Sequence, residues 1–105
     1  MKIFHMGLNT EPDWIKADAA IERWKANGNE EQAKEMTEYW EVARAKTLAL
    51  RDEIAAEVEA NGVAELSWSC MGETRHTMHS HQWAKAMPEY DFEIGRYKCI
   101  VRKKQ

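Results

Sequence analysis

The densest group of chemically versatile side chains lies in the C-terminal half of the chain. Cys70 is followed by Arg75, His76, His79 and His81. If this segment forms a strand, His79 and His81 point to the same side, and two imidazoles with a cysteine thiolate are typical ligands of zinc. Regular alternation, however, sends His76 to the opposite face and leaves Cys70 on an apolar face. A zinc site or zinc-dependent enzyme with His79, His81 and Cys70 is therefore only the third of three hypotheses.

Nucleophilic catalysis needs a thiol or hydroxyl beside a base, and the sequence offers Cys70 or Cys99 beside a histidine. It contains no nucleophile elbow, CxxC pair, phosphate-binding loop or HExxH motif. We therefore expect a protein without catalytic residues and without a resident cofactor. Two cysteines in 105 residues also fit a reducing compartment better than a disulfide scaffold.

The same C-terminal residues suit a second hypothesis, the binding of a small anionic ligand or a nucleic acid. Cationic and aromatic side chains contact phosphates and bases. Trp83 lies in an irregular segment beside the histidines, where we expect it at the surface as an anchor for a partner. The competing interpretation is a charged edge strand with a basic tail. The ligand-binding set would be Arg75, His76, His79, His81, Trp83, Arg96 and Lys98.

The leading hypothesis comes from the distribution of charge. The chain has 15 basic and 18 acidic residues, a net charge of -3, which argues against a general DNA-coating protein. Residues 11–60 hold thirteen acidic and seven basic residues, whereas residues 61–105 hold five acidic and seven basic residues. Within the acidic half, four carboxylates fall at heptad spacing opposite the apolar seam of a predicted helix: Glu31, Glu38, Asp52 and Glu59. They form either the solvated back of an amphipathic helix or a face for a basic protein partner.

Two helices are predicted to carry these carboxylates. Thr10 and Asp13 at capping-box spacing, with Pro12 between them, indicate a helix start, and Asn27-Gly28 marks its end. A second helix over residues 30–60 has a regular apolar seam and ends at Asn61-Gly62. The short connection between the helices predicts an antiparallel αα-hairpin. Because the first helix is about half as long as the second, we expect a sheet to cover the C-terminal half of the second helix.

The remaining segments read as strands. Residues 2–6 form a short apolar stretch, and residues 64–70 alternate apolar and polar side chains. Gly72-Glu73 predicts a turn, after which residues 74–80 would run back as a hairpin partner. Residues 81–91 contain Pro88 and read as a loop, with a helical turn expected near 82–87. Residues 92–102 read as the last strand, with a bulge at Gly95.

These elements predict an α+β fold in the order β-αα-β-β-β, with the helical hairpin packed on a small, mostly antiparallel sheet. We expect one domain over residues 1–105, with the hairpin at about 11–60 and the sheet at about 63–102. No apolar run exceeds three residues, so we expect a soluble cytoplasmic protein without membrane association.

We therefore expect a small non-enzymatic regulator or inhibitor of a protein partner, of the kind that serves as a phage or mobile-element accessory protein. The acidic helical face would bind the partner. Self-association as a homodimer through the long helix is a further expectation.

Overall fold

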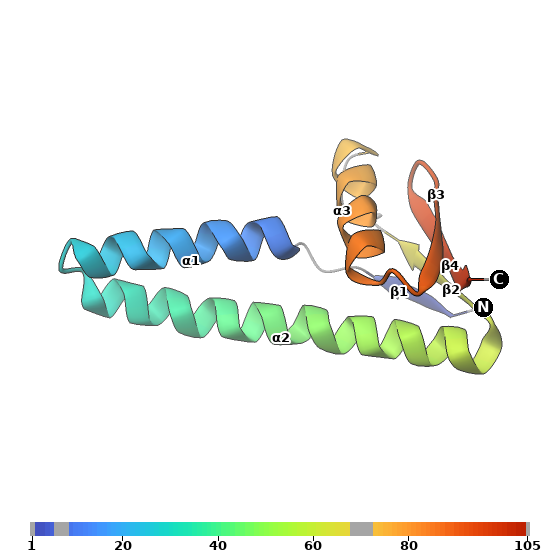
Figure 1. The fold of residues 1–105 in the computed structure, drawn as a ribbon, viewed down its shortest axis with the longest axis horizontal. Helices are drawn as coiled ribbons and strands as arrows, with labels where there is room; N and C mark the ends of the chain where they lie inside the picture. Colours follow the sequence, from blue (N-terminus) through green and yellow to red (C-terminus); the bar gives the residue numbers. More distant parts are fainter. Residues whose placement is uncertain (1, 6–8, 68–72, 105) are drawn as a thin grey trace. The chain divides into compact units, whose positions relative to one another are not determined.

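The computed structural model in Figure 1 describes residues 2–5, 9–67 and 73–104, with residues 73–77 described by their helical backbone alone. The expected α+β class, with a helical hairpin and a small, mostly antiparallel sheet, is confirmed. Within the described ranges the elements are β1 (Ile3–His5), α1 (Glu11–Ala26), α2 (Glu30–Asn61), β2 (Val63–Ser67), α3 (Glu73–Ala86), β3 (Tyr90–Ile94) and β4 (Lys98–Lys103).

The chain divides into two compact units, and the boundary lies inside α2. The helical unit is Asn9–Ala49, and the sheet unit combines Met1–Leu8 with Leu50–Gln105. Each unit has its own buried residues. The single domain that the chain length predicts stays a prediction.

The helical unit begins with the expected helix start. The backbone N–H of Thr10 donates to the Asp13 carboxylate at 2.8 Å, and Pro12 lies in the first turn of α1, where a backbone donor is not needed. At the other end Gly28 has a φ of +81°, a conformation that glycine adopts without steric cost. The predicted bounds of α1 are confirmed.

The interior of the helical unit joins α1 to α2 by apolar and polar contacts. Trp14, Ala17 and Ile21 are the buried residues of α1. The side-chain oxygen of Asn9 accepts one hydrogen bond from Trp14 Nε1 at 2.9 Å and another from the hydroxyl of Thr47 at 2.7 Å. Since Thr47 is buried on α2, Asn9 connects the start of α1 to the middle of the longer helix.

The sheet unit contains the strands in the order β1-β2-β4-β3, in which β1 is parallel to β2 and the other pairs are antiparallel. Alternate residues of each strand face the core, as the pairing of Leu66 with Cys99 and of Ala64 with Val101 shows. The opposite face is mostly polar and charged, although Ile3, Val63 and Ile100 also lie on it. The sheet is therefore buried on one face only.

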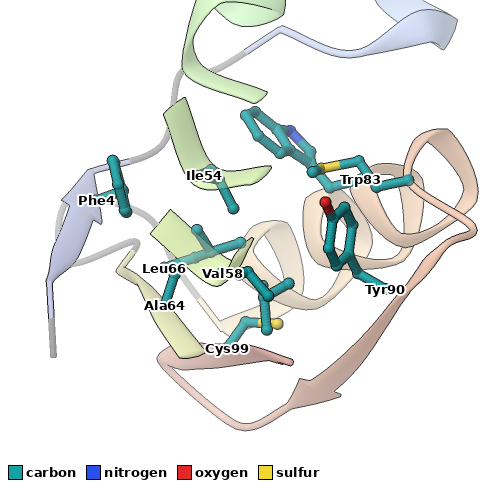
Figure 2. Close-up of a cluster of buried hydrophobic side chains, with 10 residues drawn as sticks. Phe4, Ile54, Val58, Ala64, Leu66, Trp83, Tyr90 and Cys99 are labelled. Carbon is teal, nitrogen blue, oxygen red and sulfur yellow. The ribbon is translucent and has the colours of Figure 1, made fainter. Parts of the chain in front are cut away.

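The core of the sheet unit lies between this face and two helices. Ile54 and Val58 come from α2 and Trp83 from α3, and all three side chains have no exposed surface. Figure 2 shows them together with Leu66 and Tyr90 of the sheet. Complete burial of one such aliphatic side chain contributes about 1.5–3 kcal/mol. The prediction that a sheet covers the C-terminal half of α2 is confirmed.

One predicted strand is wrong. Residues 74–80 belong to α3 and not to a hairpin partner of β2, and the helix continues to Ala86 through most of the predicted loop. The helical turn expected near residues 82–87 is the end of this helix. Burial explains the difference, because Trp83 and Met87, four residues apart, both reach the core. Residues 68–70 of the predicted strand, which include Cys70, and Gly72 of the predicted turn lie outside the described residues.

The last predicted strand is also wrong in form. Residues 92–102 do not run straight through a bulge, since β3 and β4 are separate antiparallel strands joined by a turn that begins at Gly95. The N–H of Gly95 donates to the Lys98 carbonyl at 2.9 Å. A Cβ atom at Gly95 would lie 3.0 Å from that same oxygen, a tight contact that favours glycine at this position.

Candidate partner-binding surface

The predicted acidic positions are all exposed side chains of α2. Glu31 and Glu38 lie in the helical unit, and Asp52 and Glu59 lie in the sheet unit. Two residues seven positions apart share one side of a helix, so Glu31 and Glu38 share one face of the helical unit. The structure therefore leaves the carboxylates accessible, as the sequence predicts.

Glu59 differs from the others because it has two partners within the sheet unit. Its carboxylate accepts a hydrogen bond from the Tyr90 hydroxyl at 3.0 Å and forms an ion pair with Lys103 at 3.1 Å. These contacts with Lys103 and Tyr90 lower the pKa of Glu59 below its ordinary value. Its negative charge is partly compensated, and its side chain connects α2 to β3 and β4.

Two apolar side chains next to the acidic residues were missed by the sequence analysis. Tyr39 is 62% exposed and Val42 is 56% exposed. Tyr39 also contacts Trp40 edge to face, with ring centroids 5.4 Å apart. The sequence did carry a signal for their exposure. Positions 39 and 42 fall outside the apolar seam of α2 and therefore face solvent. We define the α2 patch as the exposed residues Glu31, Glu35, Glu38, Tyr39 and Val42.

A shallow depression lies beside the α2 patch, between the end of α1 and the start of α2. Its volume is about 560 Å³. Charged side chains of both signs surround it, and Glu38 belongs both to the depression and to the α2 patch. The lining residues are Lys25, Glu30, Lys34, Thr37, Glu38 and Glu41.

The alternative ligand-binding set is not gathered on one surface. Trp83 has no exposed surface and His79 is 7% exposed, so the prediction that Trp83 is a surface anchor is wrong. The physical reason is that the segment is helical and turns Trp83 toward the core. His81 is exposed on the same helix, and the side chains of Arg75 and His76 lie outside the described residues.

Lys98 and Arg102 of β4 have acidic neighbours. Lys98 lies 3.7 Å from the carboxylate of Glu65, and Arg102 lies 2.7 Å from that of Glu93. Arg96 is exposed in the turn between β3 and β4. Ion pairs of this kind reduce the positive field that an anionic ligand or nucleic acid would meet.

The two histidines proposed as zinc ligands do not lie on one side of a strand. His79 and His81 are two positions apart on a helix, which separates their directions by about 200°. No group of three or more potential ligands is close enough to hold a metal ion among the residues that the structure describes, which do not include Cys70. Burial raises the pKa of the Cys99 thiol to about 12, which disfavours the thiolate needed for catalysis or metal binding.

Comparisons with known proteins add no functional assignment. No protein-family model matches the chain, and no match is found among curated proteins or among solved structures. In the described part of the chain, the helices are too short or too polar to cross a membrane.

Proposed function

We propose that this protein is a small non-enzymatic regulator or inhibitor that binds a basic protein partner through the acidic surface of its helical unit. The observation that carries the proposal is the exposure of Tyr39 and Val42 among the carboxylates of the α2 patch. Tyr39 contacts Trp40 and still remains 62% exposed, so much of its surface is unused within the helical unit. Tyrosine at a surface supplies both apolar area and a polar end, which is why it is enriched in interfaces.

The charges around these two residues indicate the chemistry of the partner. Glu35 precedes Tyr39 by four residues and Glu38 precedes Val42 by four, so each apolar side chain has a carboxylate next to it on the helix. Such a rim attracts lysine and arginine, increases the rate of association and rejects acidic surfaces. We therefore assign the apolar residues to affinity and the carboxylates to selection of a basic partner.

The four predicted carboxylates contribute unequally in this proposal. Glu31 and Glu38 precede the apolar pair on the same face of the helical unit, whereas Asp52 lies on the later part of α2. Glu59 already forms an ion pair with Lys103. Charge reversal at Glu31 and Glu38 should thus weaken partner binding more than reversal at Asp52 and Glu59.

Site-specific photo-crosslinking in the producing cells tests the proposal. The crosslinking amino acid p-benzoylphenylalanine replaces Tyr39 in one experiment and Tyr97, which is 55% exposed in the turn of the sheet unit, in another. We expect a crosslinked basic protein from position 39, identified by mass spectrometry. The Glu31→Lys and Glu38→Lys double variant should abolish this crosslink because the carboxylates select the partner.

The matched control is the double variant Glu89→Lys and Asp91→Lys. It makes the same change of net charge on exposed carboxylates of the sheet unit. This variant should retain the crosslink from position 39. The proposal fails if the crosslink survives reversal of Glu31 and Glu38, or if position 97 crosslinks and position 39 does not. Crosslinking to nucleic acid from position 97, lost on Arg96→Gln and Lys98→Gln, would support the anion-binding alternative instead.

A further inference from the structure

A second, narrower feature of the helical unit is a groove between α1 and α2. Its volume is about 220 Å³. Trp14 and Ile21 of α1 and Trp40 of α2 supply its apolar lining, and Trp40 is only half-buried. The complete lining is Trp14, Asp18, Ile21, Thr37, Trp40, Glu41 and Arg44.

The groove has carboxylates on both of its helices. Asp18 belongs to α1 and Glu41 to α2, and both side chains are exposed. A cation in the groove would therefore meet tryptophan and two carboxylates at once. Tryptophan is the aromatic side chain that attracts cations most strongly, and carboxylates accept hydrogen bonds from guanidinium groups.

The protein itself shows that a guanidinium is accommodated here. The Cζ atom of Arg44 lies 4.8 Å from the centroid of the Trp14 ring, within the range of cation–π attraction. Trp14 is held in place by its hydrogen bond to Asn9. The aromatic surface that Arg44 covers is thus fixed in position.

The size of the groove limits its ligand. Cavities that hold drug-sized molecules are roughly 300–1,000 Å³ in volume. A groove of about 220 Å³ fits one side chain better than a nucleotide or a complete cofactor. Arginine suits it better than lysine, because the planar guanidinium stacks on indole and bonds carboxylates in pairs.

We infer that this groove binds a single arginine side chain of the basic partner, with Trp40 as the stacking surface and Asp18 and Glu41 as acceptors. The inference rests on the proposed function, because it names the group through which the partner is recognised. Arg44 then acts as a competing internal cation that a partner arginine must displace or accommodate.

A peptide titration followed by nuclear magnetic resonance tests this inference without the natural partner. The probe is acetyl-Gly-Ser-Arg-Ser-Gly-amide, and the control peptide has neutral citrulline in place of arginine. The signals are the indole N–H resonances of Trp14 and Trp40, assigned with Trp→Phe variants. We expect saturable shifts with the arginine peptide and weaker binding of the citrulline peptide, because only the arginine peptide carries the charge.

Variants of the groove sharpen the test. The double variant Asp18→Asn with Glu41→Gln should weaken binding of the arginine peptide by about fivefold or more. Each exposed ion pair contributes up to about fivefold in affinity. Glu31→Gln with Glu35→Gln removes the same charge outside the groove and should change affinity much less. Arg44→Gln should tighten binding, whereas Lys34→Gln, which removes the same charge from the same helix, should not.

The outcomes separate the groove from the proposed function. Equal binding of the arginine and citrulline peptides, or equal effects of the two carboxylate pairs, would overturn the arginine groove. Binding of free L-arginine as tight as that of the peptide would also overturn it, in favour of a small-molecule ligand. Absence of arginine-specific binding in the groove, together with a retained crosslink from position 39, would overturn the arginine groove and leave the partner-binding proposal intact.

Discussion

The guanidinium of Arg51 lies over the ring of Trp83, 4.8 Å from its centroid. Arg51 is 8% exposed and comes from α2, and Trp83 is completely buried and comes from α3. The contact therefore joins the two helices that contribute to the same core. A cation–π contact that is shielded from water contributes about 2 kcal/mol.

Replacement of Trp83 tests this contact. Trp83→Ala should lower the free energy of unfolding by about 3–5 kcal/mol because it empties a large core volume. Trp83→Phe should cost less, since it keeps a ring below Arg51 and removes an indole N–H that has no hydrogen-bond partner among the described residues. Urea unfolding followed by circular dichroism measures both values. Equal losses for the two variants would contradict a role for the retained ring.

Glu59 should stabilise the fold only while its carboxylate is charged. The contacts with Lys103 and Tyr90 lower the pKa of Glu59 below its ordinary value in the folded protein. A group with such a shift stabilises the fold above its unfolded pKa, and the stabilisation disappears as the pH falls through the folded pKa. Wild type should therefore be more stable than Glu59→Gln near neutral pH and lose this advantage as the pH falls through the folded pKa of Glu59.

Thermal unfolding of both proteins across this pH range measures the effect. Tyr90→Phe is the matched control, because it removes one hydrogen bond to Glu59 and keeps the ion pair with Lys103. It should retain part of the pH dependence. A constant difference in melting temperature between wild type and Glu59→Gln at every pH would show that the charge of Glu59 is not involved.

Cys99 should be inert in the folded protein. Burial raises the pKa of its thiol to about 12, so the reactive thiolate is scarce near neutral pH. In a Cys70→Ser variant, which leaves Cys99 as the remaining cysteine, a disulfide reagent such as DTNB should react only after unfolding in denaturant. Rapid reaction at pH 8 without denaturant would instead show that Cys99 is an accessible nucleophile in the folded protein.

Asn9 should contribute to the stability of the helical unit through its two hydrogen bonds. Asn9→Ala leaves the donors of Trp14 and Thr47 without this acceptor, and we expect a loss of about 1–3 kcal/mol. Thr47→Val removes one donor while it keeps the side-chain shape, so its cost should be smaller. Urea unfolding measures the difference, and a larger loss for Thr47→Val would contradict the central position of Asn9.

The first two helices could be predicted because their signals are local. Thr10 and Asp13 define the start of α1, and the left-handed conformations at Gly28 and Gly62 mark the ends of α1 and α2. Such signals depend on residues within a few positions of each other. Tertiary contacts did not need to be known for these boundaries.

The third helix could not be predicted in the same way. Two of its buried positions hold the polar residues His79 and Ser80, which hide the helical spacing that leads to Trp83 and Met87. Histidine and threonine are also weak helix formers. Packing of α3 against the strands therefore decides its conformation, although its local preference favours a strand.

The candidate surface was predicted in part. Helix geometry alone shows that Glu31 and Glu38 share a face, because that inference needs only their spacing. The partners of Glu59 could not be foreseen, since Tyr90 is distant in the sequence and meets Glu59 only in the folded sheet unit. Tyr39 and Val42 were overlooked because exposure of an apolar residue depends on what packs nearby.

The parallel pairing of β1 with β2 constrains the order in which the protein can fold during synthesis. Ile3 is opposite Glu65, so β1 has no parallel neighbour until α1, α2 and β2 have been made. Contacts between segments this far apart form slowly, whereas contacts between neighbouring helices form early. Phe4, which is 5% exposed in the native state and lies opposite Leu66, therefore lacks this neighbour until β2 has been made. The helical unit can be complete before the edge of the sheet is closed.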